Sequence, residues 1–415
     1  MSEKVKILIV GNGFGGVYTL KNLHKSFCGK KNIELAMVGD KNYFLFTPLL
    51  HEVATGSLNP SNIIEPIREV LGCCIDKFYL GNVQSVNLNT HTVKLQKEDI
   101  AYDYLVLAPG AQTNFFNTPG SEENSFTLKN IEDAIKIKNH CIAQMERASH
   151  TEDEVEKRKM LKFVVVGGGP TGVELAAELA ELIQESFYRY YKCDTLKYVS
   201  MVLIQKGPEL VPQFHTKTRK KSLETLLKKG IEIKLSSTVK EVNSKFILVN
   251  DNEKIFSETV IWVGGIKPVS VSFDQEVDRT PDGRILVNEF LQLPKYKNVY
   301  AVGDVSAFKD KKTSTYLPAL AQVAEKEAKT VAKNIQLTIC GKTPQEFKYK
   351  SLGYLLSLGQ WMAVGEIFHI TFSGRFTWWL WRTVYLVKFL SLRKKIRVAI
   401  DWTMNIFSTR DISQL

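Results

Sequence analysis

Two glycine-rich loops are the segments of this chain best suited to chemistry. They run from Gly11 to Gly16 and from Gly167 to Gly172, and each stands between a short apolar run and an Ala/Leu/Glu-rich segment. In a GxGxxG loop the first glycine makes a tight turn and the second lets a pyrophosphate approach the backbone. The third lets helix and strand pack closely. The helix N-terminus that follows supplies N–H donors for phosphates.

Two such loops predict two bound dinucleotides in one chain. A pair of dinucleotides indicates hydride transfer between a nicotinamide and a flavin, because a flavin accepts two electrons and can release them differently. The expected contacts in the loops are Gly11, Asn12, Gly13, Phe14, Gly15 and Gly16 in the first and Gly167, Gly169, Pro170, Thr171 and Gly172 in the second.

A residue about 20 positions beyond each loop is expected to hold the adenosine ribose. After the first loop the next apolar run ends in Gly39 and Asp40, so Asp40 is the candidate. After the second, the corresponding run ends in Gln205 and Lys206. A neutral glutamine beside a lysine does not repel a 2′-phosphate, so the choice between NADH and NADPH is left open.

The surrounding pattern predicts the elements that position these loops. Buried strands are expected at 6–10, 33–38, 104–107, 163–166, 199–205, 231–235, 246–250, 260–264 and 299–304, and helices after each loop and at 130–159, 217–229 and 318–339. A polar linker is expected up to about residue 127, a β-hairpin at 345–373 and two amphipathic helices at 374–407.

The fold class that follows is α/β, with two Rossmann-like dinucleotide-binding domains, one inserted in the other, and a C-terminal amphipathic-helix segment that binds membranes. The expected domains are an FAD-binding domain at 1–120 and 285–345, an NAD(P)H-binding domain with its preceding helix at 121–284, and a C-terminal hairpin with helices at 346–415.

Composition narrows the class of protein. A chain of 415 residues with 44% hydrophobic and 24% charged residues is globular and too long for a single core. The six cysteines (28, 73, 74, 141, 193 and 340) show neither CxxC nor zinc spacing, so we expect a reducing compartment and no metal site. The start reads as a first strand rather than a signal peptide, and no transmembrane segment is expected.

Positive charge concentrates at the C-terminus. Residues 375–415 hold eight Arg or Lys against two Asp, a net charge of +6. On a helix from Gly374 to about Leu392, the spacing of Arg375, Arg382 and Arg393 would place all three on one face, with aromatics filling the remainder. In the next segment the apolar spacing is also helical (Ile396, Ala399, Ile400, Thr403 and Phe407). Such helices lie in the membrane interface, although a core or dimer seam would use the same aromatics.

Further motifs resemble the type II NADH:quinone oxidoreductases, the non-pumping respiratory dehydrogenases of the two-dinucleotide flavoprotein superfamily. The resemblance covers nearly the whole chain and rests on Phe44-Leu-Phe-Thr-Pro-Leu-Leu-His-Glu-Val-Ala-Thr-Gly56, Tyr102-Asp-Tyr-Leu-Val-Leu-Ala-Pro-Gly110, Val165-Val-Gly-Gly-Gly-Pro-Thr-Gly-Val-Glu-Leu-Ala176, Ile261-Trp-Val-Gly-Gly265, Ala301-Val-Gly-Asp304 and Leu317-Pro-Ala-Leu-Ala-Gln-Val-Ala324.

The resemblance implies roles for particular positions. Asp304 would hold the FAD ribityl chain, and Ala321 with Gln322 would lie against the isoalloxazine. Glu174 would sit where the nicotinamide, flavin and quinone sites meet, and its place in the first turn of a helix would stabilise a carboxylate. Glu174 and Gln322 are the expected catalytic residues. The remaining expected cofactor contacts are Val83, Ala108, Gly110, Gly303, Lys388, Gly264 and Gly265.

Two positions depart from the family pattern. Gly39 stands where an acidic residue is usual, with Asp40 one place later. The pattern Ala-Gln-x-Ala-x-Gln reads here Ala321-Gln322-Val-Ala324-Glu325-Lys326, so the second glutamine is lost. Lys388 falls off the expected arginine stripe, and as a hypothesis it faces the flavin or quinone cavity.

The expected activity is FAD-dependent oxidation of NADH with electron transfer to a membrane quinone and no proton pumping, by a protein peripheral on the cytoplasmic side of the cell membrane. A homodimer is left open, and no nucleic acid is expected. The alternatives are a sulfide:quinone oxidoreductase using Cys141 and Cys340, a soluble NAD(P)H-dependent flavin reductase, and a redox-sensing nucleic-acid-binding module. A disulfide reductase is disfavoured because Cys28 stands alone after the first loop.

Overall fold

The computed structural model describes residues 4–71, 77–368 and 370–414, so Cys73 and Cys74 lie outside the described residues. The chain divides into two compact units. Unit 1 comprises Met1–Leu45, Ile64–Gln112 and Lys267–Ser351, and unit 2 comprises Phe46–Ile63, Thr113–Ile266 and Leu352–Leu415. No sequence pattern indicated that residues 46–63 belong to unit 2. The predicted domain boundaries stay a prediction.

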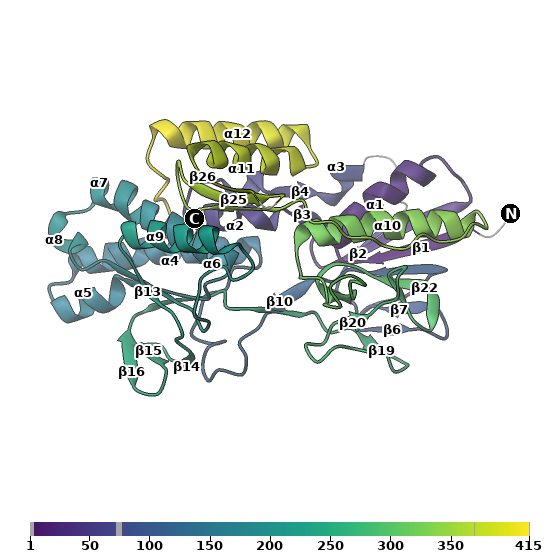
Figure 1. Ribbon diagram of the computed structural model, residues 1–415, viewed down its shortest axis with the longest axis horizontal. Helices are drawn as coiled ribbons and strands as arrows, with labels where there is room; N and C mark the ends of the chain where they lie inside the picture. The colour runs from purple at the N-terminus through teal and green to yellow at the C-terminus, as the bar shows by residue number, and fades with distance from the viewer. Residues whose placement is uncertain (1–3, 72–76, 369, 415) are drawn as a thin grey trace. The chain divides into compact units, whose positions relative to one another are not determined.

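Unit 1 is built on a six-stranded sheet ordered β21-β22-β9-β1-β2-β5 (Figure 1). Its strands are β1 (Val5–Val10), β2 (Ile33–Gly39), β5 (Lys77–Leu80), β9 (Tyr104–Leu107), β21 (Gln292–Leu293) and β22 (Tyr296–Ala301). All neighbours pair in parallel apart from β21 and β22. The carboxyl ends of the parallel strands therefore form one edge of the sheet, and the first glycine loop follows β1 at this edge.

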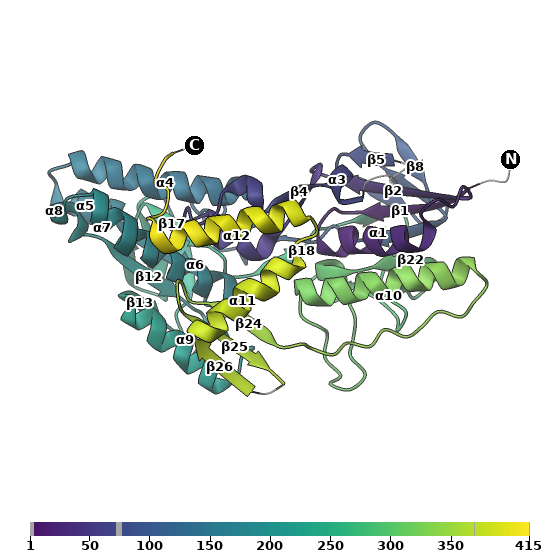
Figure 2. The ribbon, with the colours of Figure 1, turned by 90° about the horizontal axis from the view of Figure 1, so that it is seen from above.

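Helices α1 (Phe14–Phe27) and α10 (Ala321–Ile339) run beside each other in unit 1 (Figure 2). The continuous burial of Ile7–Val10 in β1 is typical of a strand covered on both faces. The smaller elements of the unit are β3 (Tyr43–Leu45), β4 (Ile64–Pro66), α3 (Ile67–Leu71), β6 (Ser85–Asn87), β7 (Thr92–Lys94), β8 (Asp99–Ala101), β19 (Ser272–Phe273), β20 (Ile285–Leu286), η4 (Gly303–Val305) and β23 (Ser306–Ala307).

Unit 2 repeats the parallel arrangement with a four-stranded sheet ordered β13-β12-β11-β17. Its strands are β11 (Lys162–Val166), β12 (Ser200–Ile204), β13 (Ile231–Lys234) and β17 (Thr259–Trp262), and a small antiparallel sheet adds β14 (Val239–Val242), β15 (Phe246–Val249) and β16 (Glu253–Phe256). The helices are α2 (Leu50–Val53), α6 (Pro170–Glu181), α7 (Tyr188–Tyr190), α8 (Cys193–Leu196) and α9 (Thr216–Lys228), with the short η1 (Thr47–Leu49), η2 (Pro60–Asn62) and the π-helical η3 (Leu182–Phe187). Strands β10 (Ala111–Thr113) and β18 (Ile266–Pro268) carry the chain between the units.

The stretch predicted as a linker followed by one long helix is different in the structure. Phe126 donates its N–H to the Val260 carbonyl at 2.8 Å, so the polar stretch packs along unit 2 rather than running free. The predicted helix is two helices, α4 (Ile131–His150) and α5 (Glu154–Met160). The break occurs because the Asp153 side chain accepts from the Val155 N–H at 2.7 Å and starts a new helix.

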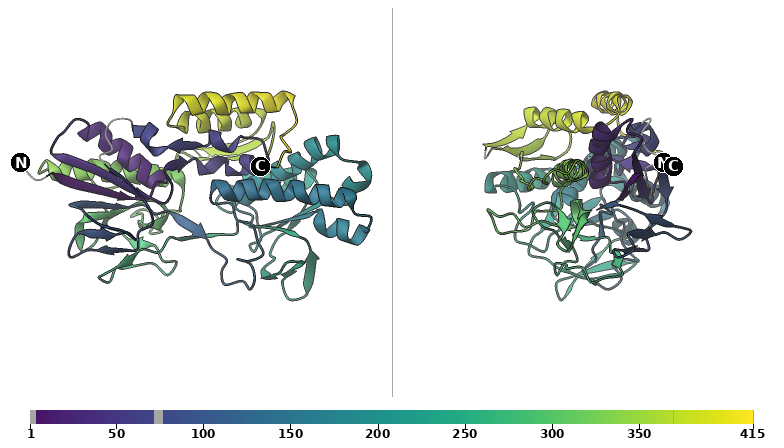
Figure 3. Two further views of the ribbon diagram at one scale, coloured as in Figure 1. Left: turned by 180° about the vertical axis from the view of Figure 1, so that it is seen from behind. Right: turned by 90° about the vertical axis from the view of Figure 1, so that its right-hand side faces the viewer.

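The C-terminal part of unit 2 contains three antiparallel strands, β24 (Tyr354–Ser357), β25 (Ala363–Ile367) and β26 (Ile370–Gly374), where a two-stranded hairpin was predicted. Two helices follow, as predicted: α11 (Arg375–Lys388) and α12 (Leu392–Phe407). Helix α12 lies over α11 (Figure 3). In the described part of the chain, no helix has both the length and the hydropathy required to cross a bilayer.

Candidate functional site

The first glycine loop, in unit 1, has the geometry that a dinucleotide pyrophosphate requires. Gly11 has φ +101°, and a Cβ built there would lie 2.0 Å from the Ala108 carbonyl oxygen. A Cβ on Gly16 would lie 1.8 Å from the Gly11 carbonyl oxygen, so α1 reaches β1 this closely only because no side chain intervenes. A Cβ on Gly13 would meet no protein atom within 4 Å. The space beside Gly13 therefore fits a phosphate group.

Asn12 explains the glycine at position 39. Its side-chain amide donates to the carbonyl oxygens of Lys41 at 2.8 Å and Tyr43 at 2.7 Å. A Cβ on Gly39 would lie 2.9 Å from Asn12 Cγ, so any side chain at position 39 would need the space that the Asn12 side chain occupies. Asp40 follows β2 and is exposed. Its contact with the ribose stays a prediction.

The other predicted FAD contacts of unit 1 follow strand ends of the same parallel sheet. They are Val83 after β5, Ala108 and Gly110 after β9, and Gly303 and Asp304 after β22. Gly303 donates its N–H to Glu327 Oε2 at 2.6 Å, and burial raises the pKa of Glu327 to about 8. Sequence reasoning missed Glu327. The spacing of Val323, Glu327 and Val331 on one buried side of α10 could have indicated it.

Ala321 and Gln322 are the first two residues of α10, and both are half-buried. The first turn of this helix carries no acidic residue, so no carboxylate of that turn offsets the positive end of the helix dipole. Lys326, which replaces the family's second glutamine, donates to the Lys350 carbonyl and lies 5.0 Å from the centre of the Tyr349 ring. The side chain at this position is thus directed towards residues 349–350.

The second glycine loop, in unit 2, repeats the geometry of the first. Gly167 has φ +118°, and a Cβ there would lie 2.5 Å from Gly264 Cα. A Cβ on Gly172 would lie 1.8 Å from the Gly167 carbonyl oxygen, while one on Gly169 would meet nothing within 4 Å. The predicted contacts Pro170 and Thr171 begin α6, Gly265 lies against the Phe116 ring, and Thr171 is exposed.

Gln205 binds the loop itself. Its side-chain Oε1 accepts the Gly168 N–H at 2.8 Å, one residue beyond the end of β12. Sequence reasoning placed Gln205 at the ribose without this bond. The neutral amide of Gln205 thus accepts a hydrogen bond from the loop, as a carboxylate could, without adding a negative charge.

Glu174 lies in the second turn of α6, not in the first turn as predicted. Its Oε1 accepts the Ser357 N–H at 3.2 Å, and its Oε2 lies 3.8 Å from His51 Nδ1. Burial raises the pKa of Glu174 well above its usual range, and the carboxyl groups of Glu52 and Glu178 add to the shift. The prediction that the helix dipole stabilises a carboxylate here is therefore wrong, because burial favours the neutral acid.

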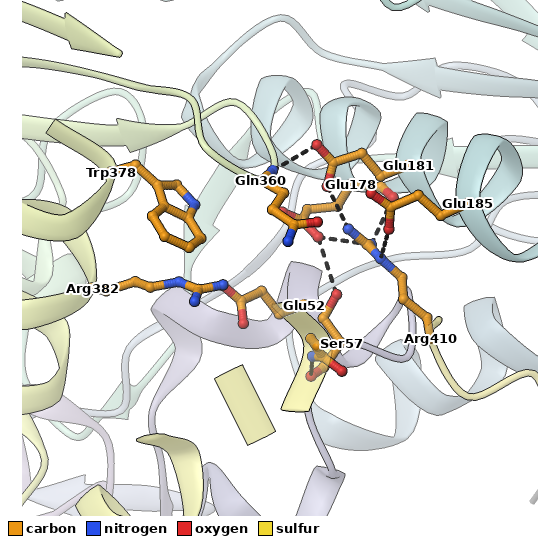
Figure 4. A pocket seen from close by; sticks show the side chains of 10 residues that line it. Glu52, Ser57, Glu178, Glu181, Glu185, Gln360, Trp378, Arg382 and Arg410 are labelled. Carbon is orange, nitrogen blue, oxygen red and sulfur yellow. Dashed lines mark hydrogen bonds and ion pairs between the residues drawn. The ribbon is translucent and has the colours of Figure 1, made fainter. Parts of the chain in front are cut away.

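A charged cavity lies within unit 2 and was not predicted. It is lined by Glu52, Ser57, Glu178, Glu181, Glu185, Gln360, Trp378, Arg382, Asn405 and Arg410 (Figure 4). Arg410 forms ion pairs with Glu178 at 2.8 Å and Glu181 at 2.6 Å, and lies 3.7 Å from Glu185. These carboxyls recur at positions three or four residues apart on α6 and η3, a spacing that places them on one face.

Comparison with known proteins assigns the family. Residues 5–328 match the pyridine nucleotide-disulphide oxidoreductase family, and residues 351–411 match the NDH2 C-terminal domain. The chain is 30% identical to "Probable NADH dehydrogenase" of Dictyostelium discoideum, over 99% of this chain and 91% of the relative. It is also 30% identical to the type II NADH:quinone oxidoreductase Ndh of Mycobacterium tuberculosis, over 98% and 89%. The chain belongs to the type II NADH:quinone oxidoreductases.

The fold agrees with this family. NDH2 from Plasmodium falciparum, solved in complex with NADH, superposes with a TM-score of 0.92 at 24% identity, covering 99% of this chain and 100% of the other. The predicted family, the α/β fold class and the predicted enzyme class are thus confirmed. The individual site residues stay predictions, and their geometry above supports them.

The arginines of the C-terminal helices do not form the single stripe on one helix that the sequence predicted. Helix α11 ends at Lys388 because Phe389 leaves helical geometry and stacks on Phe46, with ring centres 4.3 Å apart. Arg393 therefore belongs to α12. Arg382 is buried, 3.6 Å from the centre of the Trp378 ring. It is an internal cation rather than a headgroup ligand.

Some aromatic residues of α11 fit the interpretation as a membrane-interface helix, and others fit the interpretation as part of a core. Trp378 and Trp381 are fully buried, whereas Phe376 and Trp379 are exposed. Lys388, the last residue of α11, is half-buried, and its contact with a cofactor or quinone stays a prediction. The sulfide:quinone oxidoreductase alternative would use Cys141 and Cys340. Cys141 is buried in α4, and Cys340 is the C-cap of α10.

Proposed function

We propose that this chain oxidises NADH and reduces a membrane quinone, with FAD as its resident cofactor. The repeated geometry of the two glycine loops carries the proposal. In each loop the third glycine would place a Cβ 1.8 Å from the carbonyl oxygen of the first, and the second glycine faces open space. One chain therefore has two sites of the same design for dinucleotide phosphates.

Each unit would hold one dinucleotide. In unit 1 the backbone of Gly11–Gly16 would hold the FAD pyrophosphate, Asp304 the ribityl chain, and the N-terminus of α10 at Ala321 and Gln322 the ring. When bound, FAD supplies a group that accepts a hydride and releases its electrons to a quinone. In unit 2 the loop Gly167–Gly172 would hold NADH. Glu174 would orient the quinone and transfer a proton to its oxygen.

Gln205 bears on the choice of nucleotide. An acid at this position would repel a 2′-phosphate, and Gln205 does not. The glutamine side chain is already engaged with the Gly168 N–H, so it offers no strong selection for NADPH either. We propose NADH as the main substrate, with measurable oxidation of NADPH.

A single experiment tests the activity. The purified protein is expected to be yellow, to lose its flavin absorbance on rapid mixing with NADH, and to regain it with a short-chain quinone. NADPH is expected to act in the same way but more slowly. A protein that stays colourless after soaking in FAD would overturn the proposal, and bleaching by sulfide but not by NADH would favour the sulfide reading.

Helix α12 supports the membrane as the partner surface because large apolar side chains on it are exposed. Five large apolar residues of the helix, Leu392, Ile396, Ile400, Met404 and Phe407, are between 53% and 83% exposed. Its buried residues are Lys394, Val398 and Trp402, and polar contacts help to hold this side against the protein. Asp401 accepts from Asn62 Nδ2 at 2.7 Å, and Lys394 donates to the Ser61 carbonyl at 2.6 Å. We propose that the exposed apolar face, extended by Phe376, Trp379 and Val387 of α11, lies in the membrane interface on the cytoplasmic side.

Acidic residues on this face are expected to release the protein from membranes. The double variant Ile400→Glu/Met404→Glu should bind vesicles of phosphatidylcholine and phosphatidylglycerol about tenfold or more weakly, because each substitution removes apolar contact and adds repulsion from anionic lipid. Co-sedimentation measures the effect. Leu227→Glu, at a residue 52% exposed on α9, is the matched control and should bind as wild type.

The same variant separates a membrane face from a dimer seam. If vesicle binding is unchanged while the double variant converts a dimer to a monomer in sedimentation, the face joins two copies of the chain and the membrane proposal fails. Unchanged fluorescence of the buried tryptophans would show that both variants fold.

A further inference from the structure

The charged cavity of unit 2 holds more acids than bases. Its volume is about 20 Å³, which is room for roughly one water molecule. Five carboxyls lie in or beside it, namely Glu52, Glu174, Glu178, Glu181 and Glu185, and three cations, Lys229, Arg382 and Arg410. Buried like charges without counterions are costly, so the cluster favours protonation of some of these acids.

The ion pairs show which acids hold the cations. Arg410 pairs with Glu178 and Glu181, and Lys229 adds a second bond to Glu181 at 2.6 Å. Arg382 donates to the Trp402 carbonyl at 3.3 Å and stacks on the Trp378 ring. Strong cationic partners are thus concentrated around Glu178 and Glu181.

Glu52 and Glu174 have neutral hydrogen-bond donors instead. Glu52 Oε2 accepts the Trp402 indole N–H at 2.6 Å, and Glu174 Oε1 accepts the Ser357 N–H. Burial raises the pKa of Glu52 to about 8, with Glu178 adding to the shift and Arg382, the Trp402 bond and Arg410 opposing it. Burial thus favours the protonated form of both acids inside the protein.

The cavity extends from Glu52 to Glu185, and Glu174 lies beyond it. Glu185 stands at its exposed end, with 38% of its side chain exposed, whereas Glu52 is 3% exposed. Next to Glu52 in the chain, His51 places Nδ1 3.8 Å from Glu174, and its buried Nε2 has no hydrogen-bond partner. Burial and Arg410 lower the pKa of His51 to about 3, so its ring stays neutral and does not retain the proton.

We propose that this cavity is a proton inlet, in which Glu52 passes a solvent proton entering at Glu185 on to Glu174 for quinone reduction. The inference rests on the proposed function. The reaction NADH + H⁺ + quinone → NAD⁺ + quinol takes one proton from solvent per turnover. Glu174 first gives its proton to the quinone oxygen and becomes a carboxylate. The O–H bond of Glu52 then breaks as its proton moves to that carboxylate through His51 or water, and a new O–H bond forms on Glu52 with a proton from the Glu185 end.

The Glu52→Gln variant tests the inlet. Glutamine keeps an oxygen acceptor for the Trp402 indole but cannot carry a proton. Bleaching of the flavin absorbance by NADH without quinone consumes no solvent proton, so its rate should be unchanged. Recovery of the absorbance with quinone at pH 7 should slow about tenfold or more. In wild type this second rate should fall as pH rises through about 8, because Glu52 loses its proton, and the variant should lack that titration.

A readout independent of turnover is the infrared carbonyl band of a buried protonated carboxyl at neutral pH. This band should be weakened in Glu52→Gln and intact in Glu152→Gln, which removes an exposed acid between α4 and α5. The variant Glu185→Gln, at the cavity mouth, serves if Glu52→Gln does not fold, and it should slow quinone-dependent recovery while leaving bleaching intact.

The outcomes separate two failures. If NADH does not bleach the wild-type protein, the proposed function fails. If wild type responds to NADH and quinone while Glu52→Gln, or Glu185→Gln in its place, keeps the wild-type quinone rate and pH profile, the inlet is refuted and the cluster only holds the fold together.

Discussion

Gly16→Ala is expected to abolish flavin binding, leaving less than about a tenth of the wild-type flavin content because close helix–strand packing at the loop is lost. The added methyl would lie 1.8 Å from the Gly11 carbonyl oxygen, a backbone atom that cannot rotate away. The Gly11 N–H is bound to the Val38 carbonyl at 2.8 Å, which fixes the loop to β2. Helix α1 must therefore move from the sheet, and its N-terminus would leave the pyrophosphate.

Flavin content per protein, from the visible spectrum against the tryptophan absorbance, measures this result. Lys25→Ala is the control, because Lys25 is exposed on the same helix and its variant should retain wild-type flavin content. A yellow, NADH-reactive Gly16→Ala protein would show that the first loop does not hold the cofactor.

Arg410→Ala is expected to destabilise the protein by about 3–5 kcal/mol at pH 8, the cost of leaving buried partners of a cation unpaired. Arg410 is 6% exposed and binds Glu178 and Glu181 through its guanidinium. Its backbone N–H also donates to Ser186 Oγ at 3.0 Å, on η3. Loss of the side chain leaves the carboxylates beside one another without their main counterion.

The loss should depend on pH. The pKa of Glu181 is already raised by burial in wild type, and removal of the guanidinium raises it further. An acid whose folded-state pKa exceeds its unfolded value lowers stability above that unfolded value, and the penalty disappears below it, at about pH 4. The destabilisation should therefore shrink as pH falls from 8 towards 5.

Urea unfolding at both pH values measures this stability difference. Arg189→Ala removes an exposed arginine of α7 and should change stability by less than about 0.5 kcal/mol. A loss below about 1 kcal/mol for Arg410→Ala, equal at both pH values, would mean that the ion pairs contribute little.

The glycine loops could be predicted from sequence because their information is local. A strand, a turn and a helix occur within a few residues of one another, and only glycine satisfies the φ of +101° at Gly11 and of +118° at Gly167. The parallel strands that follow were predictable for the same reason, since short β-branched runs between turn residues are typical of buried strands.

The charged cavity could not be predicted, because its members come from distant parts of the chain. Glu52 lies on α2, Glu178 lies on α6 and Arg410 follows the end of α12, and each has an ordinary surface interpretation in the sequence. Arg382 shows the same limit. Helical spacing placed it on a face with Arg375, but spacing does not reveal that Trp378 and Trp402 enclose it.

In the proposed membrane-bound state, the contacts on the inner side of α12 would limit how far the protein sinks into a lipid leaflet. Asp401 and Lys394 bind the inner side of the helix to η2 by hydrogen bonds, and Val398 and Trp402 are buried on that side, so turning or detaching the helix would break these contacts. Only the outer half of its circumference is available to acyl chains, a depth of roughly 5–10 Å. The enzyme would therefore float at a fixed height, and its substrate would have to rise to the headgroup level to meet it.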